Sequence, residues 1–271
     1  MDQEASVTRL RRAKPLLGTL VEIGLSYGNL HEQQGMAVLD EGFAAVARIH
    51  SLMSNHDPLS ELSQLNDCAV DRWFAVSPGS MQVLEFCLQL NQLSAGVFDP
   101  CAHQAGQVSC RDLEFDSKNR RVKKHRALHL DLGGVAKGYA VDSAVRVMQS
   151  RATLQDCIDV SGWVNAGGDC AVFGASSLPL LTRLPWALSE PIATELISNC
   201  SAATSANDPS ILTRINHGKT RLSAGAQVCA TVVAPTCMVA DALTKVVLAT
   251  VNQCDDVLKF FGARSWYFSQ E

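Results

Sequence analysis

Two pairs of glycines in this sequence are candidates for holding a phosphate group. Gly133-Gly134 follows a predicted strand and immediately precedes a predicted helix, and Gly167-Gly168 follows a second predicted strand. Because glycine has no Cβ atom, the backbone N–H groups of such turns can approach a phosphate closely. A tight turn alone would explain a single pair. Two pairs, each beside an aspartate (Asp131 and Asp169), favour a binding site.

A third carboxylate, Asp241, lies near the start of an otherwise apolar segment, residues 237–250, that predicts a helix. Two interpretations of Asp241 are open. It is either an N-terminal charge favoured by the helix dipole or a ligand for a hard cation. Two common nucleotide sites are excluded, because neither glycine pair fits the G-x-G-x-x-G pattern or the glycine, lysine and hydroxyl spacing of a P-loop.

The elements that would position these residues can be read from the spacing of apolar side chains. Alternation predicts strands, and three- and four-residue spacing predicts helices. Strands are predicted over residues 16–25, 121–132 and 156–164, and a further strand is predicted to end at residue 234. Helices are predicted over residues 31–53, 80–92 and 237–250. Residues 177–191 resist classification and are expected to be a loop with short strands. This irregular order predicts an α+β fold with mixed sheets and packed helices.

The length of 271 residues and the 47% apolar content allow a large core. We expect a mobile N-terminal arm over residues 1–13 and a single domain over residues 14–271. This domain could consist of two intertwined subdomains. The net charge is −4, and lysine and arginine are scattered along the chain. Nucleic acid is therefore not an expected partner, because no basic stripe is present to neutralise phosphates.

The cysteines and the apolar segments indicate where the protein works. The ten cysteines contain no C-x-x-C pair and lie singly within apolar segments, which favours buried free thiols over a zinc site or a disulfide framework. The first residues lack the apolar stretch of a signal peptide, and no segment is long and apolar enough to insert stably in a membrane. A cytoplasmic location is expected.

The order of motifs along the chain resembles one known family. The motifs are LLGTLVEI, MSNHDPLSELSQLN, GVFDP, DLGGVAKGYAVD, VNAGGD, ATS and APTCMVADALTK. Together they resemble the FAD:protein FMN transferase (ApbE-like) family over roughly residues 10–250. DLGGVAKGYAVD (131–142) and the ADAL segment (240–243) carry most of the resemblance, whereas ATS (203–205) would be uninformative alone.

The resemblance implies an ApbE-like flavin transferase fold and a reaction. Members of the family split FAD, release AMP and attach the FMN half through a phosphoester to a Thr or Ser hydroxyl of an acceptor flavoprotein, with Mg²⁺ as cofactor. A hard cation held by carboxylate and carbonyl oxygens would neutralise the pyrophosphate as its P–O–P link breaks. The expected partners are FAD, as substrate, and an acceptor flavoprotein.

The resemblance also assigns candidate site residues. Leu17 stands where the family often has a methionine against the flavin. The expected cofactor-binding residues are Leu17, Val97, Phe98, Asp99, Asp131, Lys137, Gly167 and Gly168; the expected metal ligands are the Gly134 carbonyl, Asp241 and Thr244; and the expected catalytic residues are Asp241, Lys245 and His217.

Two positions depart from the family pattern. Four residues after its metal-binding aspartate the family usually has a threonine ligand, whereas this chain has Lys245. A protonated ammonium cannot bind Mg²⁺, although it can contact a phosphate. Thr244 is one residue out of register, about 100° around the helix, and would substitute only if the helix shifts.

The second departure concerns the general base. The family's H-x-x-D-P segment should fall near residues 213–220, where this chain reads TRINHGKT and places His217 near the aspartate position. A histidine there could take a proton from a hydroxyl at neutral pH, or it could simply be an exposed loop residue. His56 is a second candidate, and His125 and His129 are expected to have no chemical role. The base is left unassigned.

These departures leave two further functions open. With water as the acceptor, the same site would be an FAD pyrophosphatase that yields FMN and AMP. If the departures have removed catalysis, the protein would be a catalytically impaired FAD-binding protein.

Overall fold

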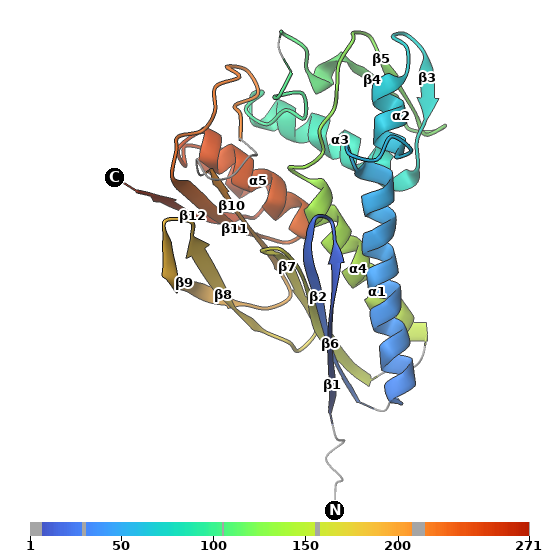
Figure 1. Cartoon of the computed structure of the whole chain (residues 1–271), viewed down its shortest axis with the longest axis vertical. Helices are drawn as coiled ribbons and strands as arrows, with labels where there is room; N and C mark the ends of the chain where they lie inside the picture. The colour runs from blue at the N-terminus through green and yellow to red at the C-terminus, as the bar shows by residue number, and fades with distance from the viewer. Residues whose placement is uncertain (1–6, 29–30, 105, 155–157, 208–214, 271) are drawn as a thin grey trace, which may run out of the picture.

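The computed structural model describes residues 7–28, 31–104, 106–154, 158–207 and 215–270. Within them, seven strands form one sheet in the order β1-β2-β6-β7-β10-β11-β12 (Figure 1). These strands are β1 (Thr8–Leu16), β2 (Thr19–Gly28), β6 (Ile158–Ala166), β7 (Asp169–Phe173), β10 (Ser201–Asn207), β11 (Val228–Ala234) and β12 (Arg264–Ser269). Every pairing among them is antiparallel.

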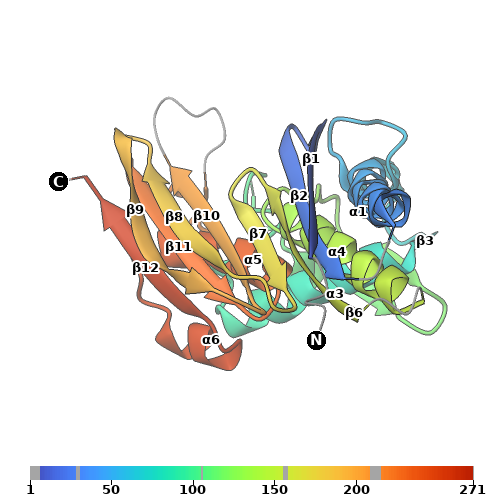
Figure 2. The ribbon, with the colours of Figure 1, turned by 90° about the horizontal axis from the view of Figure 1, so that it is seen from below.

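Helices cover one face of this sheet (Figure 2). The helices of the described ranges are α1 (Glu32–Met53), α2 (Glu61–Asp67), α3 (Pro78–Leu93), α4 (Ala136–Leu154), α5 (Cys237–Ala249) and α6 (Asp255–Phe260), with a 3₁₀ turn at Cys110–Asp112. α1 packs on α4, and α4 packs on α5 and on β6 and β7. The apolar side chains that recur along α1 at helical spacing, among them Leu39, Phe43 and Val46, are buried, as the sequence predicted.

The N-terminal segment is more ordered than the sequence suggested. Residues 8–16 form β1, which pairs with β2 along its whole length, so the described part of the expected mobile arm is an edge strand. The single strand predicted over residues 16–25 is the end of β1, a turn and most of β2. The turn residues Leu17 and Gly18 both have positive φ, 55° and 69°. The turn could not be predicted from the sequence, because leucine seldom adopts a positive φ.

Two smaller sheets complete the structure. β3 (Trp73–Ala75), β5 (Arg121–Lys124) and β4 (Leu113–Asp116) pair beside α2 and α3, at the end of the molecule away from the N-terminus (Figure 1). The strand predicted over residues 121–132 therefore ends at Lys124. The unclassified stretch contains the hairpin of β8 (Leu178–Leu184) and β9 (Ala187–Ile197), in agreement with the expected short strands.

The β8–β9 hairpin explains why β11 is buried on both faces. Leu180 and Ile197 of the hairpin pack on Val233 on one side of the sheet, while α5 packs on the other side. The Thr182 hydroxyl lies 2.7 Å from the Thr231 hydroxyl, so the polar side chains buried in this layer are satisfied.

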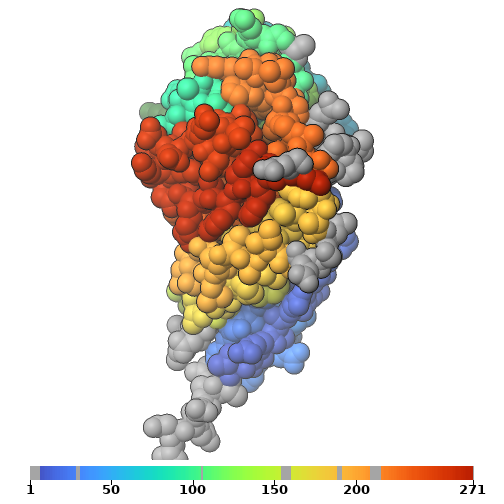
Figure 3. All heavy atoms as spheres, turned by 90° about the vertical axis from the view of Figure 1, so that its left-hand side faces the viewer, coloured from blue at the N-terminus to red at the C-terminus, as the bar shows by residue number. Residues whose placement is uncertain are grey.

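Residues 215–224 fold back on the turn that follows α3 (Figure 3). The Gly218 N–H donates to the Val97 carbonyl (2.7 Å), and the Arg221 guanidinium donates to the Val108 carbonyl. A Cβ atom at Gly218 would lie 2.3 Å from the Gly96 carbonyl oxygen, so only glycine fits this approach. The segment thereby joins the C-terminal half of the chain to the turn at 96–99.

The predicted α+β class is confirmed. All strand pairings within the described residues are antiparallel, a point that the expectation of mixed sheets left open. Within the same residues no helix is both long enough and apolar enough to cross a membrane.

Candidate active site

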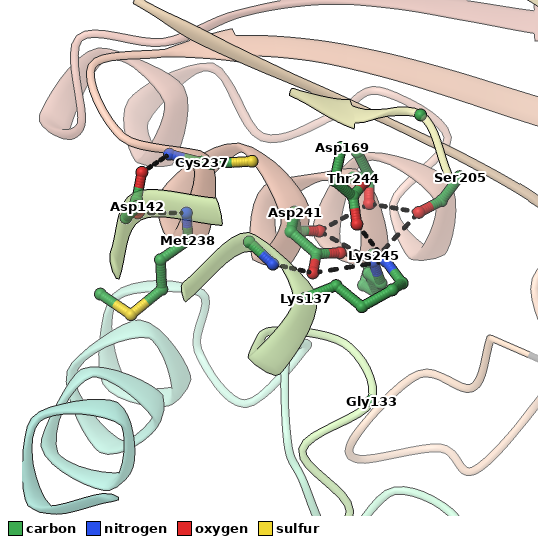
Figure 4. A network of polar contacts seen from close by, with 12 residues as sticks. Gly133, Lys137, Asp142, Asp169, Ser205, Cys237, Met238, Asp241, Thr244 and Lys245 are labelled. Atoms are coloured by element: carbon green, nitrogen blue, oxygen red, sulfur yellow. Dashed lines mark hydrogen bonds and ion pairs between the residues drawn. The ribbon is translucent and has the colours of Figure 1, made fainter. Parts of the chain in front are cut away.

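Two lysines and two aspartates meet where α4, α5 and β7 come together (Figure 4). The Lys137 ammonium forms an ion pair with the Asp169 carboxylate and lies 3.6 Å from Oδ2 of Asp241. The Lys245 ammonium forms an ion pair with Oδ1 of Asp241. The two aspartates are buried, whereas both lysine side chains reach the surface in part. We call these four residues the charge cluster.

The first glycine pair leads the chain into α4 and so places Lys137. Oδ1 of Asp131 accepts the Gly133 N–H (2.8 Å), which fixes the turn before the helix. Gly134 lies against Lys245, because a Cβ atom there would be 3.4 Å from the lysine Cε. The first turn of α4 thus lies over the charge cluster, where helix N–H groups favour an anion.

Gly138 allows α4 and α5 to approach each other at the charge cluster. A Cβ atom at this position would lie 2.3 Å from the Cys237 carbonyl oxygen, a fixed backbone atom. The Gly138 N–H donates to Oδ2 of Asp241 (3.1 Å). This glycine therefore sets the distance between the helices that carry Lys137 and Asp241.

α5 presents Asp241 and Lys245 on one face, because they are four residues apart. Thr244 is one residue out of register with them, yet its buried hydroxyl also lies beside the cluster: it donates to the Asp241 carbonyl (2.6 Å) and lies 2.7 Å from the Ser205 hydroxyl (Figure 4). The Ser205 hydroxyl also accepts from the Lys245 ammonium (3.0 Å). β10 therefore places Ser205 beside the charge cluster.

The second glycine pair forms the turn between β6 and β7. Gly167 and Gly168 have φ values of 66° and 103°, so this turn requires glycine. The turn delivers Asp169 into the interior at 1% exposure. Its Oδ1 atom has no hydrogen-bond partner among the described residues. The turn is exposed, and the Gly168 N–H donates to Oδ1 of Asn165 (3.0 Å).

The charges of the cluster depend on one another. Burial disfavours the ammonium of Lys137, but Asp241 and Asp169 more than offset burial and raise the pKa of Lys137. Burial would raise the pKa of Asp241, yet Lys137 and Lys245 lower it overall. Burial and the repulsion of Asp241 together raise the pKa of Asp169. Asp241 is thus the carboxylate that both lysines share.

Asp142 ties α4 to the N-terminus of α5. Its two carboxylate oxygens accept the N–H groups of Cys237 and Met238, each at 2.8 Å (Figure 4). These N–H groups have no partner within α5, so Asp142 satisfies them and interacts favourably with the helix dipole. Burial nevertheless raises the pKa of Asp142 to about 6.

This pKa predicts a pH dependence of stability. The pKa of Asp142 is higher in the folded protein than the value of about 3.9 in an unfolded chain. Its contribution to stability is therefore fully present below about pH 4 and is lost as the pH rises through about 6. Asp142→Asn should remove this component. Urea unfolding of both proteins from pH 4 to 7 checks it, and parallel curves would contradict it.

A cavity of about 690 Å³ opens beside the β1–β2 turn and is lined by Leu17, Thr19 and His50, among others. The Leu17 N–H donates to Nδ1 of His50 (3.1 Å), which holds the turn in its unusual conformation. Thr19 lies against Gly167, because a Cβ atom on that glycine would be 2.5 Å from the threonine hydroxyl. Thr19 thus brings the β1–β2 turn, which carries Leu17, next to the second glycine turn. The expected contact of Leu17 with the flavin stays a prediction.

The expected flavin-binding turn at Val97, Phe98 and Asp99 is mostly buried. Phe98 and Asp99 are buried, and Val97 is half-buried. Oδ1 of Asp99 accepts the N–H groups of Cys101 and Cys110 at 2.9 and 3.2 Å, so this carboxylate holds the turn together. In this structure Asp99 positions the turn and does not point outward to a ligand.

The histidines lie apart from the charge cluster in their contacts. Nδ1 of His217 accepts the backbone N–H groups of Lys219 and Thr220, so this nitrogen braces a turn of the 215–224 segment. His103, which the sequence did not single out, lies 3.8 Å from Asp131 at the first glycine turn and 3.4 Å from the Asn216 amide. The expected role of His217 as a base stays a prediction.

The residues present do not fit a bound Mg²⁺ ion. Mg²⁺ requires six oxygen ligands in a near-ideal octahedron. Both carboxylate oxygens of Asp241 already have partners, and Thr244 is bonded to Ser205 and to the helix backbone. No group of three His, Cys, Asp or Glu side chains in the described ranges could hold a metal. Two ammonium groups at the same place would repel a cation.

The structure therefore brings Lys137, Asp241, Thr244, Lys245 and both glycine turns together, and leaves His217 and Asp99 outside their contacts. It adds Asp169 and Ser205, which the sequence had not assigned a role. Signals for both were present: Asp169 directly follows the second glycine pair, and Ser205 ends the ATS triplet. Neither signal shows by itself that the side chain faces α5.

Comparison with known proteins identifies relatives of this chain. The sequence profile of the ApbE family matches residues 17–108 and 102–260. An FAD:protein FMN transferase from Chlamydia pneumoniae is 28% identical over 238 residues, which cover 74% of this chain and 72% of that protein.

Solved structures show the same fold. The ApbE protein of Thermotoga maritima matches with a TM-score of 0.79 at 21% identity, covering 97% of each chain. The flavin transferase ApbE of Vibrio cholerae matches with a TM-score of 0.77 at 18% identity, covering 98% of this chain and 95% of that one. The Pseudomonas stutzeri flavinyl transferase ApbE, in its apo form, matches with a TM-score of 0.80 at 16% identity, covering 100% of this chain and 94% of that one. Because the family profile spans most of the sequence, the chain belongs to the ApbE family.

Proposed function

We propose that this chain is an FAD:protein FMN transferase, which moves FMN from FAD to a Thr or Ser hydroxyl of an acceptor flavoprotein and releases AMP. The observation that carries the proposal is the charge cluster beside the two glycine turns: two lysines, anchored by buried carboxylates, with both lysine side chains partly exposed. Ammonium groups of this kind can bind a pyrophosphate. The similarity to the Chlamydia pneumoniae transferase supports the same activity.

The chemistry needs one bond to form and one to break. The acceptor hydroxyl oxygen attacks the phosphorus of the FMN half, and the bond from that phosphorus to the bridging oxygen breaks. AMP leaves with the bridging oxygen, and the hydroxyl proton passes to solvent or to a side-chain base. Lys137 is one-third exposed and can contact the pyrophosphate directly. Fixed ammonium and N–H groups stabilise the charge that grows on the departing oxygen.

The test is to incubate the purified protein with FAD and the isolated acceptor domain of a covalently flavinylated protein, and to quantify AMP, FMN and acceptor mass. We expect AMP in equal amount to the acceptor that has gained an FMN group. AMP with free FMN in place of labelled acceptor would indicate a pyrophosphatase. FAD that stays intact and bound would indicate a binding protein. Either result would overturn the proposal.

We also propose that the protein works in a reducing compartment, such as the cytoplasm. The nine cysteines of the described residues are all free. Burial raises the pKa of several of these thiols, for example that of Cys229 to about 11, so they are poor nucleophiles and resist oxidation. Mass spectrometry after alkylation of protein from intact cells would test this, and a disulfide would contradict it.

A further inference from the structure

The place beside Asp241 already holds a positive charge that belongs to the chain. The Lys245 ammonium contacts Oδ1 of Asp241, the Asp241 carbonyl oxygen (3.0 Å) and the Ser205 hydroxyl (3.0 Å). These three oxygens use the three N–H donors of the ammonium. Because Lys245 has only 17% of its side chain exposed, it is built into the site and is not a surface lysine that happens to lie nearby.

The charges balance without another cation. Lys137 and Lys245 carry two positive charges, and Asp169 and Asp241 carry two negative charges when ionised. A divalent cation added here would have to displace an ammonium from Asp241 or remain beside two like charges. A divalent cation would repel each ammonium twice as strongly as a monovalent cation would at the same distance. The cluster thus resists a divalent cation.

We infer that the Lys245 ammonium takes the place of a divalent cation at Asp241, so that this protein binds the pyrophosphate of FAD without a metal. Lys245 supplies the fixed positive charge, and Lys137 supplies the direct contact because its side chain is more exposed. The inference rests on the proposed function only for the identity of the ligand.

The experiment measures FAD binding and metal binding separately. FAD affinity is followed by flavin fluorescence in EDTA and in excess Mg²⁺, and Mg²⁺ binding to the FAD-free protein is followed by calorimetry. We expect the two FAD dissociation constants to agree within about twofold and Mg²⁺ to show no binding. In Lys245→Thr, a hydroxyl replaces the ammonium beside Asp241, so FAD binding should become at least about tenfold tighter with Mg²⁺ than in EDTA.

Two further variants complete the test. Lys245→Met removes the charge and offers no oxygen, so FAD binding should weaken in both solutions. Lys259→Thr, the same change as Lys245→Thr on an exposed lysine of α6, should behave as the unchanged protein. FAD binding that is lost in EDTA, or calorimetric binding of Mg²⁺ by the unchanged protein, would overturn the inference.

The two proposals fail in different ways. Tight, metal-independent FAD binding without AMP release would refute the transferase activity but not the inference that Lys245 replaces a metal ion. AMP release that requires Mg²⁺ would refute that inference but not the transferase activity. If FAD does not bind in either solution, the proposed function fails, and Mg²⁺ binding by the FAD-free protein then decides the inference by itself.

Discussion

Replacing Asp241 with asparagine should lower the free energy of unfolding by about 3–5 kcal/mol, because it leaves two ammonium groups without their shared, buried counter-ion. Asp241 is fully buried, contacts Lys245 directly and lies 3.6 Å from Lys137. For a chain of this size the loss corresponds to a fall in melting temperature on the order of 10 °C. Urea unfolding and calorimetry of both proteins measure it.

A double variant tests whether the lost stability comes from the unbalanced charge. In Asp241→Asn/Lys245→Met, one ammonium is removed together with one carboxylate, so the remaining Lys137 and Asp169 form a balanced pair. We expect most of the lost stability to return. AMP release should nevertheless remain at least about 100-fold below that of the unchanged protein, because a fixed charge at the phosphate is gone. A double variant no more stable than Asp241→Asn would show that the charge balance is not what Asp241 provides.

Replacing Gly138 with alanine should destabilise the protein by about 3 kcal/mol. The added Cβ atom would lie 2.3 Å from the Cys237 carbonyl oxygen and 2.6 Å from its carbon, and neither backbone atom can rotate away. The helices α4 and α5 must then separate, which also weakens the hydrogen bond from the Gly138 N–H to Asp241. On helix propensity alone, alanine would instead stabilise α4 by about 1 kcal/mol. The sign of the change in the free energy of unfolding, measured with urea, therefore shows whether the clash or the helix propensity dominates.

Gly225→Ala is the matched control. Its added Cβ atom would make an ordinary contact, 3.6 Å from Cγ1 of Val228, and the backbone of Gly225 needs no positive φ. We expect a change within about 0.5 kcal/mol. If Gly138→Ala is as mild as this control, the close approach of the two helices does not limit stability.

The sequence predicted the parts of the fold that depend on local patterns. The apolar spacing of α1, α3 and α5 gave their positions to within a few residues, and the glycine pairs gave the two turns beside the site. It failed at the start of the chain, where residues 8–16 are an edge strand. A basic, polar segment looks mobile by composition, and only its pairing with β2 orders it.

The sequence by itself identified the family and the candidate site residues Lys137, Asp241 and Lys245, because motif order and residue type are properties of the chain. Tertiary structure decided their arrangement. Asp169 and Ser205 lie 72 and 36 residues before Asp241, and only the adjacency of β7, β10 and α5 shows that they meet it. Tertiary structure likewise turned Asp99 inward. Contacts between residues far apart in sequence leave no periodic trace, so the meeting of Asp169 and Ser205 with the Asp241–Lys245 pair became visible only in the folded chain.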